Sequence, residues 1–548
     1  MRSASIQTFA KTLRAGARAA LSHLPGARPS AVVVELSGAV VPRTERPRFF
    51  GLPIRPPGQR AAPSLESIGE ALDALAAAPW VSRVVFRFEG MSADPATAFA
   101  LRRRIEALGA AGKQTVAWLS EVEWTSYYVA SACAEIVAPP SADIGLRGLG
   151  VSITFLRDAL DKIGVRFEKL AIDEYKNAFD GLSRSEMSPH HREQLEALLD
   201  GFLAHYTGAI AARRGLTPER VREIVDLGIT SAEQARAEKL LDRVAYEDEV
   251  IGPDHRAYRE AARFLGARVP ALGKRIALVT LNGTIITGRS RGLPLPVPGA
   301  GGRTAGSETL ARALRAAASD PSTAAVVFLV DSGGGSALAS DLIAREVKRL
   351  AEKKPVVGLM GAIAASGGYY VLAPATQIIA APTTITGSIG VITGKVVLAD
   401  LFARAGVRAE RVERGRYALL LDPSRPLGDE DRALLARSNQ EIYERFLATV
   451  AEGRKLSRDR VNEIGRGRIW SGAAAKERGL VDELGDLDTA LALARKLGGL
   501  PEGAPVWEVP APEEMVLPSA DPDAMVRALL PLARETSWVL LPARFRVG

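Results

Sequence analysis

A serine inside a run of small residues is the first candidate for chemistry in this sequence. Ser366 lies in Gly361–Tyr370 (GAIAASGGYY), after an apolar run expected to be a strand, Val356–Met360, and before an apolar helix. A serine at a strand-to-helix turn presents its hydroxyl beside the backbone N–H groups of the helix start, which suits a nucleophile with an oxyanion hole. Such a stretch is also typical of an ordinary helix start, so a base that activates Ser366 has to be found.

The histidines do not supply an obvious base. All five precede residue 256, so the part of the chain that carries Ser366 has none. His190 and His191 open a polar helix, where exposed positions without a catalytic role are expected. A Ser–His–Asp triad is therefore disfavoured.

An internal repeat points to a different base. Short motifs recur 242 residues later, among them VVF at 84–86 and 326–328 and YYV at 127–129 and 369–371. Recurrence at one offset indicates an ancestral domain that was duplicated and fused.

The two repeats differ where chemistry is expected. Trp124 stands at the position of Ser366, and Ala418 stands at the position of Lys176, so each repeat carries one half of a Ser–Lys dyad. A lysine acts as a general base only after losing its proton, and burial lowers its pKa from about 10.4 because it disfavours the ammonium. Taken alone, Lys176 is better explained as a surface lysine, and the complementary repeat is what favours the dyad.

Two further segments are candidates for the same site. Asp331–Ser336 (DSGGGS) follows a strand-like run, and its glycines let backbone N–H groups approach a ligand closely. The segment lacks the GK[ST] ending of a phosphate loop. Thr386–Val391 (TGSIGV) contains Ser388, whose hydroxyl is suited to hold a neutral lysine. Each segment is also compatible with a plain turn.

Short apolar strands alternate with amphipathic helices in both repeats, which predicts an α/β fold. The predicted organisation is a cationic amphipathic segment at 1–28, a first repeat at 29–250, a linker at 251–273, a second repeat at 274–500 and a Pro-rich extension at 501–548.

Composition excludes several classes of protein. Hydrophobic residues make up 47% of the 548 and charged residues 24%, which is ordinary globular usage. The single cysteine, Cys133, excludes an internal disulfide and a multi-cysteine metal site. The net charge of +8 is spread along the chain without a nucleic-acid-reading module, so no nucleic-acid partner is expected.

Membrane contact is left open by the sequence. No apolar stretch reaches the roughly 18 residues that a span needs, and no signal peptide is expected. Apolar residues at 5–24 recur at helical spacing opposite basic ones, which suits either an interfacial membrane helix or a helix packed on its own protein.

Several motifs together resemble the long, tandem-duplicated form of the bacterial signal peptide peptidase A family over about residues 29–500. The motifs are MGAIAASGGYYVLAPA, TGSIGV, the Gly-rich turn, DEYKNAFD and GAAAKERGLVDEL. The resemblance implies two tandem crotonase/Clp-protease-like ββα superhelix domains. It implies Ser366 as nucleophile, Lys176 as general base, Ser388 as the group that orients the lysine, and the backbone N–H groups of Gly335 and Gly367 as the oxyanion hole.

The same resemblance implies a serine endopeptidase that hydrolyses short apolar peptides such as signal-peptide remnants, without metal or cofactor. It also implies a homo-oligomer, with a tetramer expected, associated with the inner membrane; a cytoplasmic or peripheral location is the alternative. The family's Asn-Ser-Pro-Gly-Gly turn is Asp331–Gly335 here, with Gly333 replacing the proline. A looser turn and weaker activity are therefore expected, and a peptide-binding scaffold is the alternative function. A crotonase-type acyl-CoA enzyme is disfavoured, because it gives the split dyad no purpose.

Overall fold

The computed structural model describes residues 28–43, 48–49, 52–53, 63–252, 254–265, 273–292, 303–512, 514–515 and 538–540. The predicted amphipathic segment at 1–28 lies outside these ranges, apart from its last residue. The chain divides into two compact units, the first made of residues 1–150, 202–272 and 547–548 and the second of residues 151–201 and 273–546. Residues 151–201, which the sequence assigns to the first repeat, thus pack within the second unit.

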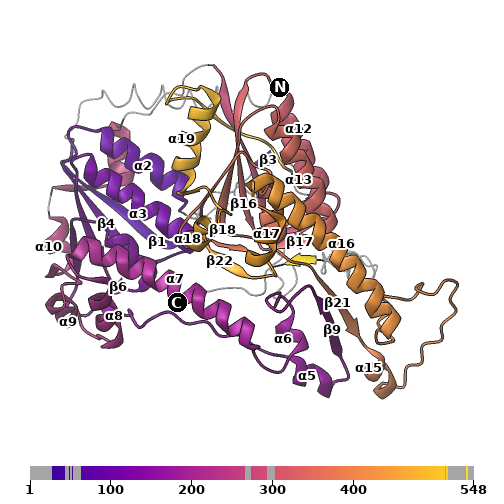
Figure 1. Ribbon diagram of the computed structural model, residues 1–548. Helices are drawn as coiled ribbons and strands as arrows, with labels where there is room; N and C mark the ends of the chain where they lie inside the picture. Colours follow the sequence, from indigo (N-terminus) through magenta and orange to yellow (C-terminus); the bar gives the residue numbers. More distant parts are fainter. Residues whose placement is uncertain are drawn as a thin grey trace. The chain divides into compact units, whose positions relative to one another are not determined.

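The first unit is built on a parallel sheet with the strand order β10-β7-β5-β4-β1-β11. Its strands are β1 (Ala31–Val40), β4 (Arg83–Ala93), β5 (Gln114–Leu119), β7 (Glu135–Ala138), β10 (Arg243–Val244) and β11 (His255–Ala257). Helices α2 (Leu65–Ala77) and α3 (Pro95–Ala110) lie side by side in this unit (Figure 1).

The second unit repeats this topology. Its main sheet has the order β22-β20-β18-β16-β12-β24, and β19 pairs with both β18 and β23. The strands are β12 (Arg275–Asn282), β16 (Thr323–Ser332), β18 (Val356–Ala365), β19 (Gln377–Ala380), β20 (Ile385–Gly387), β22 (Ile469–Ser471), β23 (Glu483–Leu484) and β24 (Val506–Glu508). The path β23-β19-β18-β16-β12-β24 matches the first sheet strand for strand, so the predicted α/β fold with two tandem domains is confirmed.

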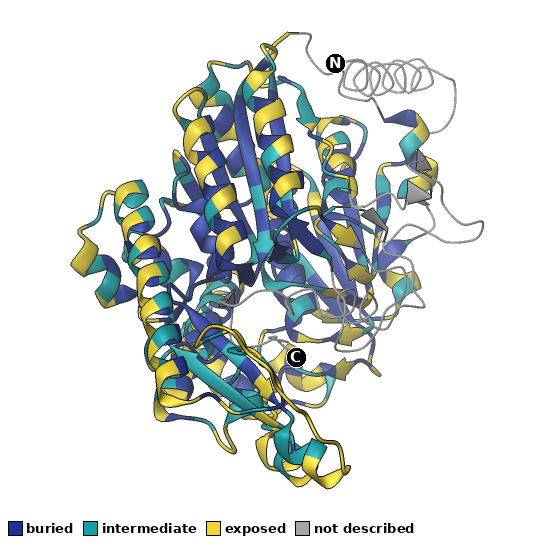
Figure 2. Cartoon of the chain, turned by 90° about the vertical axis from the view of Figure 1, so that its right-hand side faces the viewer, coloured by how far each residue is buried: buried dark blue, intermediate teal, exposed yellow. Residues whose placement is uncertain are grey.

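Helices cover both faces of the second unit's main sheet. They are α12 (Ser307–Ser319), α13 (Ala337–Ala351) and α19 (Leu487–Gly498). Alternate residues of β16 point to opposite faces, as the pleat requires. Phe328 and Val330 pack with α12 and α13, whereas Val327 packs with α19. The strands are accordingly buried and the outer helix faces are exposed (Figure 2).

Two edge strands lie in segments predicted as a linker and as a Pro-rich extension. β11, within 251–273, pairs with β1, and β24, within 501–548, pairs with β12 in the same parallel sense. Three-residue strands are too short to show a hydrophobic period, which explains why the sequence does not predict them.

A second sheet in the second unit carries the strands around the candidate site, in the order β15-β13-β17-β26-β21-β9. These strands are β9 (Arg166–Ala171), β13 (Thr284–Ile286), β15 (Thr304–Gly306), β17 (Gly334–Ser336), β21 (Ile392–Val397) and β26 (Trp538–Leu540). Within the described ranges, no helix is both long enough and apolar enough to cross a bilayer.

Candidate active site

Ser366 lies at a sharp turn between strand β18 and helix α14 (Gly367–Leu372). Its φ is +57°, in the left-handed region, where a residue with a side chain pays about 1–3 kcal/mol of strain. The Ser366 N–H donates to the carbonyl of Gly387 at 2.8 Å. A Cβ on Gly368 would lie 2.4 Å from the carbonyl oxygen of Ser332, so only glycine allows α14 to begin so close to that turn.

Ser388 follows strand β20 as Ser366 follows strand β18. The two strands are parallel, and Ala365 pairs with Gly387. The carboxyl ends of parallel strands meet at one edge of a sheet, so the next residue of each strand, a serine in both cases, lies at the same edge. Ser388 also has a positive φ, +53°, and its N–H donates to the carbonyl of Arg468 at 2.6 Å.

Lys176 reaches this edge from the loop after strand β9. β9 pairs antiparallel with β21, with Ala171 opposite Ile392. The Ile172 N–H continues this pairing by donating to the carbonyl of Val391 at 2.9 Å. Strand β21 begins only a few residues after Ser388, so its long-range pairing with β9 brings the lysine loop to the serine.

The three side chains form one buried cluster. Lys176 Nζ lies 2.6 Å from Ser366 Oγ, 2.8 Å from Ser388 Oγ and 2.7 Å from the Ser388 carbonyl oxygen. All three residues are fully buried, and this burial holds the pKa of Lys176 well below its usual range. A neutral amine has two N–H donors and one lone pair. A neutral Lys176 that donates to both Ser388 oxygens would keep its lone pair for the proton of the Ser366 hydroxyl.

Gly335 sits in strand β17, where its backbone packs directly against strand β13. A Cβ at this position would lie 2.0 Å from the carbonyl oxygen of Ile285. The turn before it contacts the start of α14 through Ser332 and Gly368, as described above. The turn before strand β17 thus lies against the start of α14, the helix that follows Ser366.

The turn that contains Gly333 is held by side chains despite its missing proline. Ser332 Oγ donates to the carbonyl of Gly283 at 2.6 Å and accepts from the Gly334 N–H at 3.1 Å. Asp331 Oδ1 accepts from the Ile363 N–H at 3.1 Å. These bonds restrain the turn on both sides of Gly333.

Strand β26 lies between strand β17 and strand β21. Its residue Val539 is opposite Gly335 in an antiparallel pairing, and Trp538 is opposite Ile392. The backbone edge beside Gly335 is thus occupied by a strand from the C-terminal part of the same chain.

Two glycines that the sequence analysis did not single out contact the lysine. A Cβ on Gly467, whose φ is +82°, would lie 2.7 Å from the Cβ of Lys176. A Cβ on Gly390 would lie 3.4 Å from the Lys176 Cδ. Gly390 belongs to the TGSIGV motif, whereas nothing local in the sequence marks Gly467.

Neither histidine that opens helix α7 (Pro189–Arg214) reaches the serine cluster. The expectation that both are exposed is wrong for His191, which is 1% exposed. Burial lowers the pKa of His191, and its Nδ1 lies 3.7 Å from Asp180 Oδ2. The His191 side chain faces the buried Asp180, which comes directly after the loop of Lys176, and does not face solvent.

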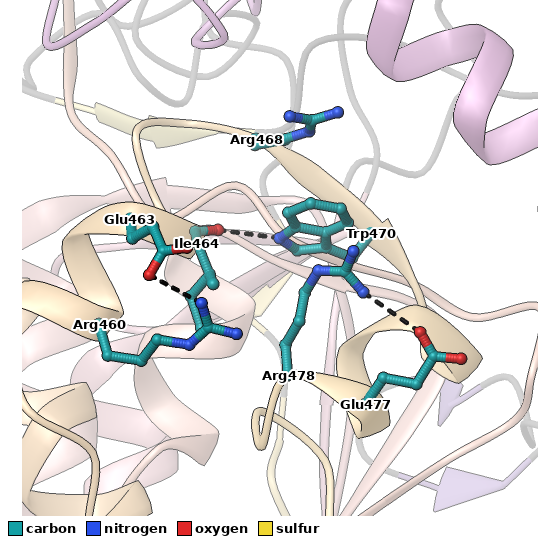
Figure 3. A pocket seen from close by; sticks show the side chains of 7 residues that line it. All are labelled: Arg460, Glu463, Ile464, Arg468, Trp470, Glu477 and Arg478. Carbon is teal, nitrogen blue, oxygen red and sulfur yellow. Dashed lines mark hydrogen bonds and ion pairs between the residues drawn. The ribbon is translucent and has the colours of Figure 1, made fainter.

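A solvent-facing pocket lies on the outer side of strand β22 and does not include the serine cluster (Figure 3). The Trp470 ring at its centre has the guanidinium groups of Arg468 and Arg478 at 4.8 and 3.8 Å from its centroid. Trp470 is paired with Thr386 of β20, and a Cβ on Gly387 would lie 2.8 Å from the ring. The ring thus covers the strand that leads into Ser388.

Sequence comparisons with known proteins agree on one family. The family model described as Peptidase family S49 matches residues 107–255 and 348–500. Serine protease SPPA, chloroplastic, of Arabidopsis thaliana is 34% identical, over 80% of this chain and 66% of its own length. Protease 4 of Salmonella typhi is 31% identical, over 76% of this chain and 68% of its own length. This chain therefore spans about two thirds of the length of these relatives. The solved structure of ClpP1 from Listeria monocytogenes matches 39% of this chain and 94% of its own, at 17% identity and a TM-score of 0.24.

Proposed function

Because the chain belongs to Peptidase family S49, a family of serine endopeptidases, we propose that it hydrolyses peptide bonds with a Ser366–Lys176 dyad. The observation that carries this proposal is the 2.6 Å distance between Lys176 Nζ and Ser366 Oγ in a site closed to water. Burial lowers the pKa of Lys176, and a lower pKa favours the neutral amine that a general base requires.

The proposed reaction uses the short distances from Lys176 Nζ to Ser366 and Ser388. Lys176 Nζ takes the hydroxyl proton of Ser366 while Oγ attacks the scissile carbonyl carbon, and the resulting ammonium gives that proton to the leaving amine. The acyl-enzyme ester is then attacked by a water molecule that Lys176 deprotonates in the same way, which releases the carboxylic acid and restores the serine. Ser388 orients the amine through its hydroxyl and carbonyl oxygens.

The negative charge of the tetrahedral intermediate requires hydrogen-bond donors. We assign this role to the backbone N–H groups of Gly367, which follows Ser366 in the chain, and of Gly335, whose preceding turn contacts the start of α14. Donors fixed in position in a dry site stabilise a developing oxyanion strongly; removing one typically slows an enzyme by about 10²–10³-fold.

The substrate of this proposal is an extended peptide with small or apolar side chains, such as a signal-peptide remnant. An extended conformation is supported by β26, a strand of this chain that pairs antiparallel with both β17 and β21. Ser366 is fully buried, so a substrate reaches it after a covering segment moves. The small apolar preference rests on the sequence resemblance.

Assembly and location belong to the same proposal. A homo-oligomer, expected to be a tetramer, is supported by exposed apolar side chains near helix α5 (Arg157–Lys162) and after helix α15 (Ala399–Arg404). Ile163, Val407 and Val412 are exposed by 54%, 51% and 86%. The inner-membrane location rests on the family resemblance, and the residue pattern at 5–24 is a candidate for the peripheral contact. Light scattering after size exclusion tests the subunit number, and flotation with anionic vesicles tests the membrane contact.

The experiment that tests the function compares wild type with Ser366→Ala on a fluorogenic signal-peptide-like substrate, with a serine-directed covalent probe located by mass spectrometry. Cleavage and labelling of Ser366 by wild type, both absent in the variant, are expected. Peptide binding without cleavage or labelling in wild type would instead establish the scaffold, and undiminished cleavage by Ser366→Ala would assign the nucleophile elsewhere.

A further inference from the structure

We propose that Gln194 and Asn177 are positioning residues that hold the backbone of Lys176 so that its amine faces Ser366. This inference rests on the proposed function, since it concerns the same lysine. Neither amide touches a reacting atom; both act through the loop on which the lysine is carried.

The lysine needs such support because its loop has no regular structure. Residues 172–179 connect strand β9 with the short helix α6 (Asp180–Ser183), and Lys176 lies in the middle of this connection. A loop of this length has many conformations in the absence of tertiary hydrogen bonds, whereas a general base must be held to within about 0.5 Å of its working position.

Gln194 links the lysine loop to the sheet that carries the serines. It is 1% exposed and lies on helix α7. Its Nε2 donates to the Tyr175 carbonyl at 3.3 Å and to Asn177 Oδ1 at 2.6 Å. Its Oε1 accepts from the N–H of Ile469, the first residue of strand β22, at 3.2 Å. One buried amide therefore binds both neighbours of Lys176 in the chain and the strand next to β20.

Asn177 and two charged residues complete the support. Asn177 Nδ2 donates to Asp180 Oδ2 at 2.7 Å and to the Glu174 carbonyl at 3.1 Å. Lys169 Nζ donates to the Lys176 carbonyl at 3.2 Å and forms a hydrogen-bonded ion pair with the buried Asp180. The polar groups of three consecutive residues around the lysine are thus fixed from outside the loop.

The second repeat provides an internal comparison. Helix α16 (Asp429–Arg454) has the same 26-residue length as α7, which places Leu434 at the position of Gln194. The match of Tyr175 with Tyr417 places Leu419 at the position of Asn177. Both amides are therefore leucine in the repeat whose lysine position is an alanine. The amides accompany the lysine, which a purely structural role in the repeated fold would not require.

Loss of the amide hydrogen bonds should change the pH dependence of activity, which a purely structural role of these residues would not do. A loosened loop admits water to Lys176, and hydration removes the burial that lowers its pKa. The amine is then protonated near neutral pH and regains activity only as the pH rises toward the ordinary lysine range. Gln194 and Asn177 act through the loop that carries Lys176, so we expect their loss to change kcat much more than KM.

The test measures kcat and KM of the full-length chain from pH 6 to 10 for wild type, Gln194→Met and the matched control Gln440→Met. Methionine has nearly the same shape as glutamine but cannot make the three hydrogen bonds, and Gln440 is an exposed α16 residue bonded to Glu444. We expect Gln194→Met to lower kcat at pH 7 by about tenfold or more, to leave KM within about twofold, and to recover at high pH, since one pKa unit changes the neutral fraction tenfold. Gln440→Met should match wild type.

A kcat profile of Gln194→Met that superimposes on that of wild type would overturn the inference. Thermal melting establishes that the variant is folded, and Asn177→Leu, which copies the second repeat, serves if Gln194→Met does not fold. A parallel measurement of Lys176→Ala separates the two levels of argument. If Lys176→Ala is as active as wild type, the proposed dyad fails; if it is inactive and Gln194→Met is normal, the positioning role alone fails.

Discussion

Ser366 and Ser388 each follow the last residue of a parallel strand, and those last residues, Ala365 and Gly387, are paired. The register of two neighbouring strands thus places both hydroxyls at one edge of the sheet, where Lys176 Nζ lies 2.6 Å from one and 2.8 Å from the other. Positive φ angles at both serines, +57° and +53°, turn the chain sharply after the strands. The register of β18 and β20 therefore places the two serines, and the loop after β9 brings Lys176 to them.

Removal of the Ser388 hydroxyl should slow catalysis moderately. Ser388→Ala leaves the carbonyl contact to Lys176 intact and deletes one hydrogen bond, which is worth about 0.5–1.5 kcal/mol, so kcat should fall by about 3- to 10-fold. Steady-state kinetics of Ser388→Gly provide the control, because glycine also lacks the hydroxyl but accepts the positive φ without strain. A loss seen in Ser388→Ala but not in Ser388→Gly would trace the effect to the backbone and refute the role of the hydroxyl.

The buried lysine should make stability depend on pH. Because burial lowers the pKa of Lys176, unfolding takes up a proton between that value and the unfolded value of about 10.4. The free energy of unfolding of wild type should therefore rise with pH in this window, by about 1.4 kcal/mol per pH unit from this group. Lys176→Met binds no proton in either state and lacks this contribution.

Melting temperatures of wild type and Lys176→Met across pH 7–10 measure the effect. The variant's melting temperature relative to that of wild type should be highest at neutral pH and should decline as the pH rises. Lys353→Met is the matched control, since Lys353 is exposed. A difference between Lys176→Met and wild type that stays constant with pH would contradict a neutral buried lysine.

Gly335→Ala should impair turnover through the backbone. The new Cβ would lie 2.0 Å from the Ile285 carbonyl oxygen, so strand β17 must move away from β13 and carry its N–H groups with it. Loss of one oxyanion donor predicts a fall in kcat of about 10²–10³-fold. Gly208→Ala, in helix α7 with nothing within 4 Å, should leave kcat unchanged. Normal turnover by Gly335→Ala would exclude Gly335 from the oxyanion hole.

Weakening strand β26 should improve substrate binding. Val539 pairs with Gly335 at the edge where a peptide strand is expected to bind, and a proline at 539 removes a backbone N–H and disfavours strand pairing. Val539→Pro should therefore lower KM several-fold without lowering kcat, as measured with saturating peptide. A KM equal to that of wild type would argue that the substrate binds elsewhere.

The residues of the site that could be predicted from the sequence are those at which the two repeats differ. Ser366 and Lys176 stand out because Trp124 and Ala418 replace them, and the strands around them show clear apolar runs. The alternation of strands and helices could also be predicted, because hydrophobic periodicity is visible in short windows of the sequence.

Other features depend on contacts between distant segments and leave no local trace. Gln194 and Asn177 are ordinary polar residues in a helix and a loop until the fold buries them beside Lys176. Gly467 is one of 51 glycines, and only the folded structure shows that its backbone lies against Lys176. The inward orientation of His191 likewise follows from packing beneath the lysine loop, which a polar helical pattern does not reveal.

The most direct test of the dyad is the rate of peptide cleavage from pH 6 to 10 for wild type beside Lys176→Ala. Wild-type activity should rise with an apparent pKa well below 10, as the direction of the Lys176 pKa requires, and Lys176→Ala should lose about 10²–10⁴-fold at every pH. A variant that lacks Lys176 and still cleaves at near the wild-type rate would contradict the assignment of lysine as the general base.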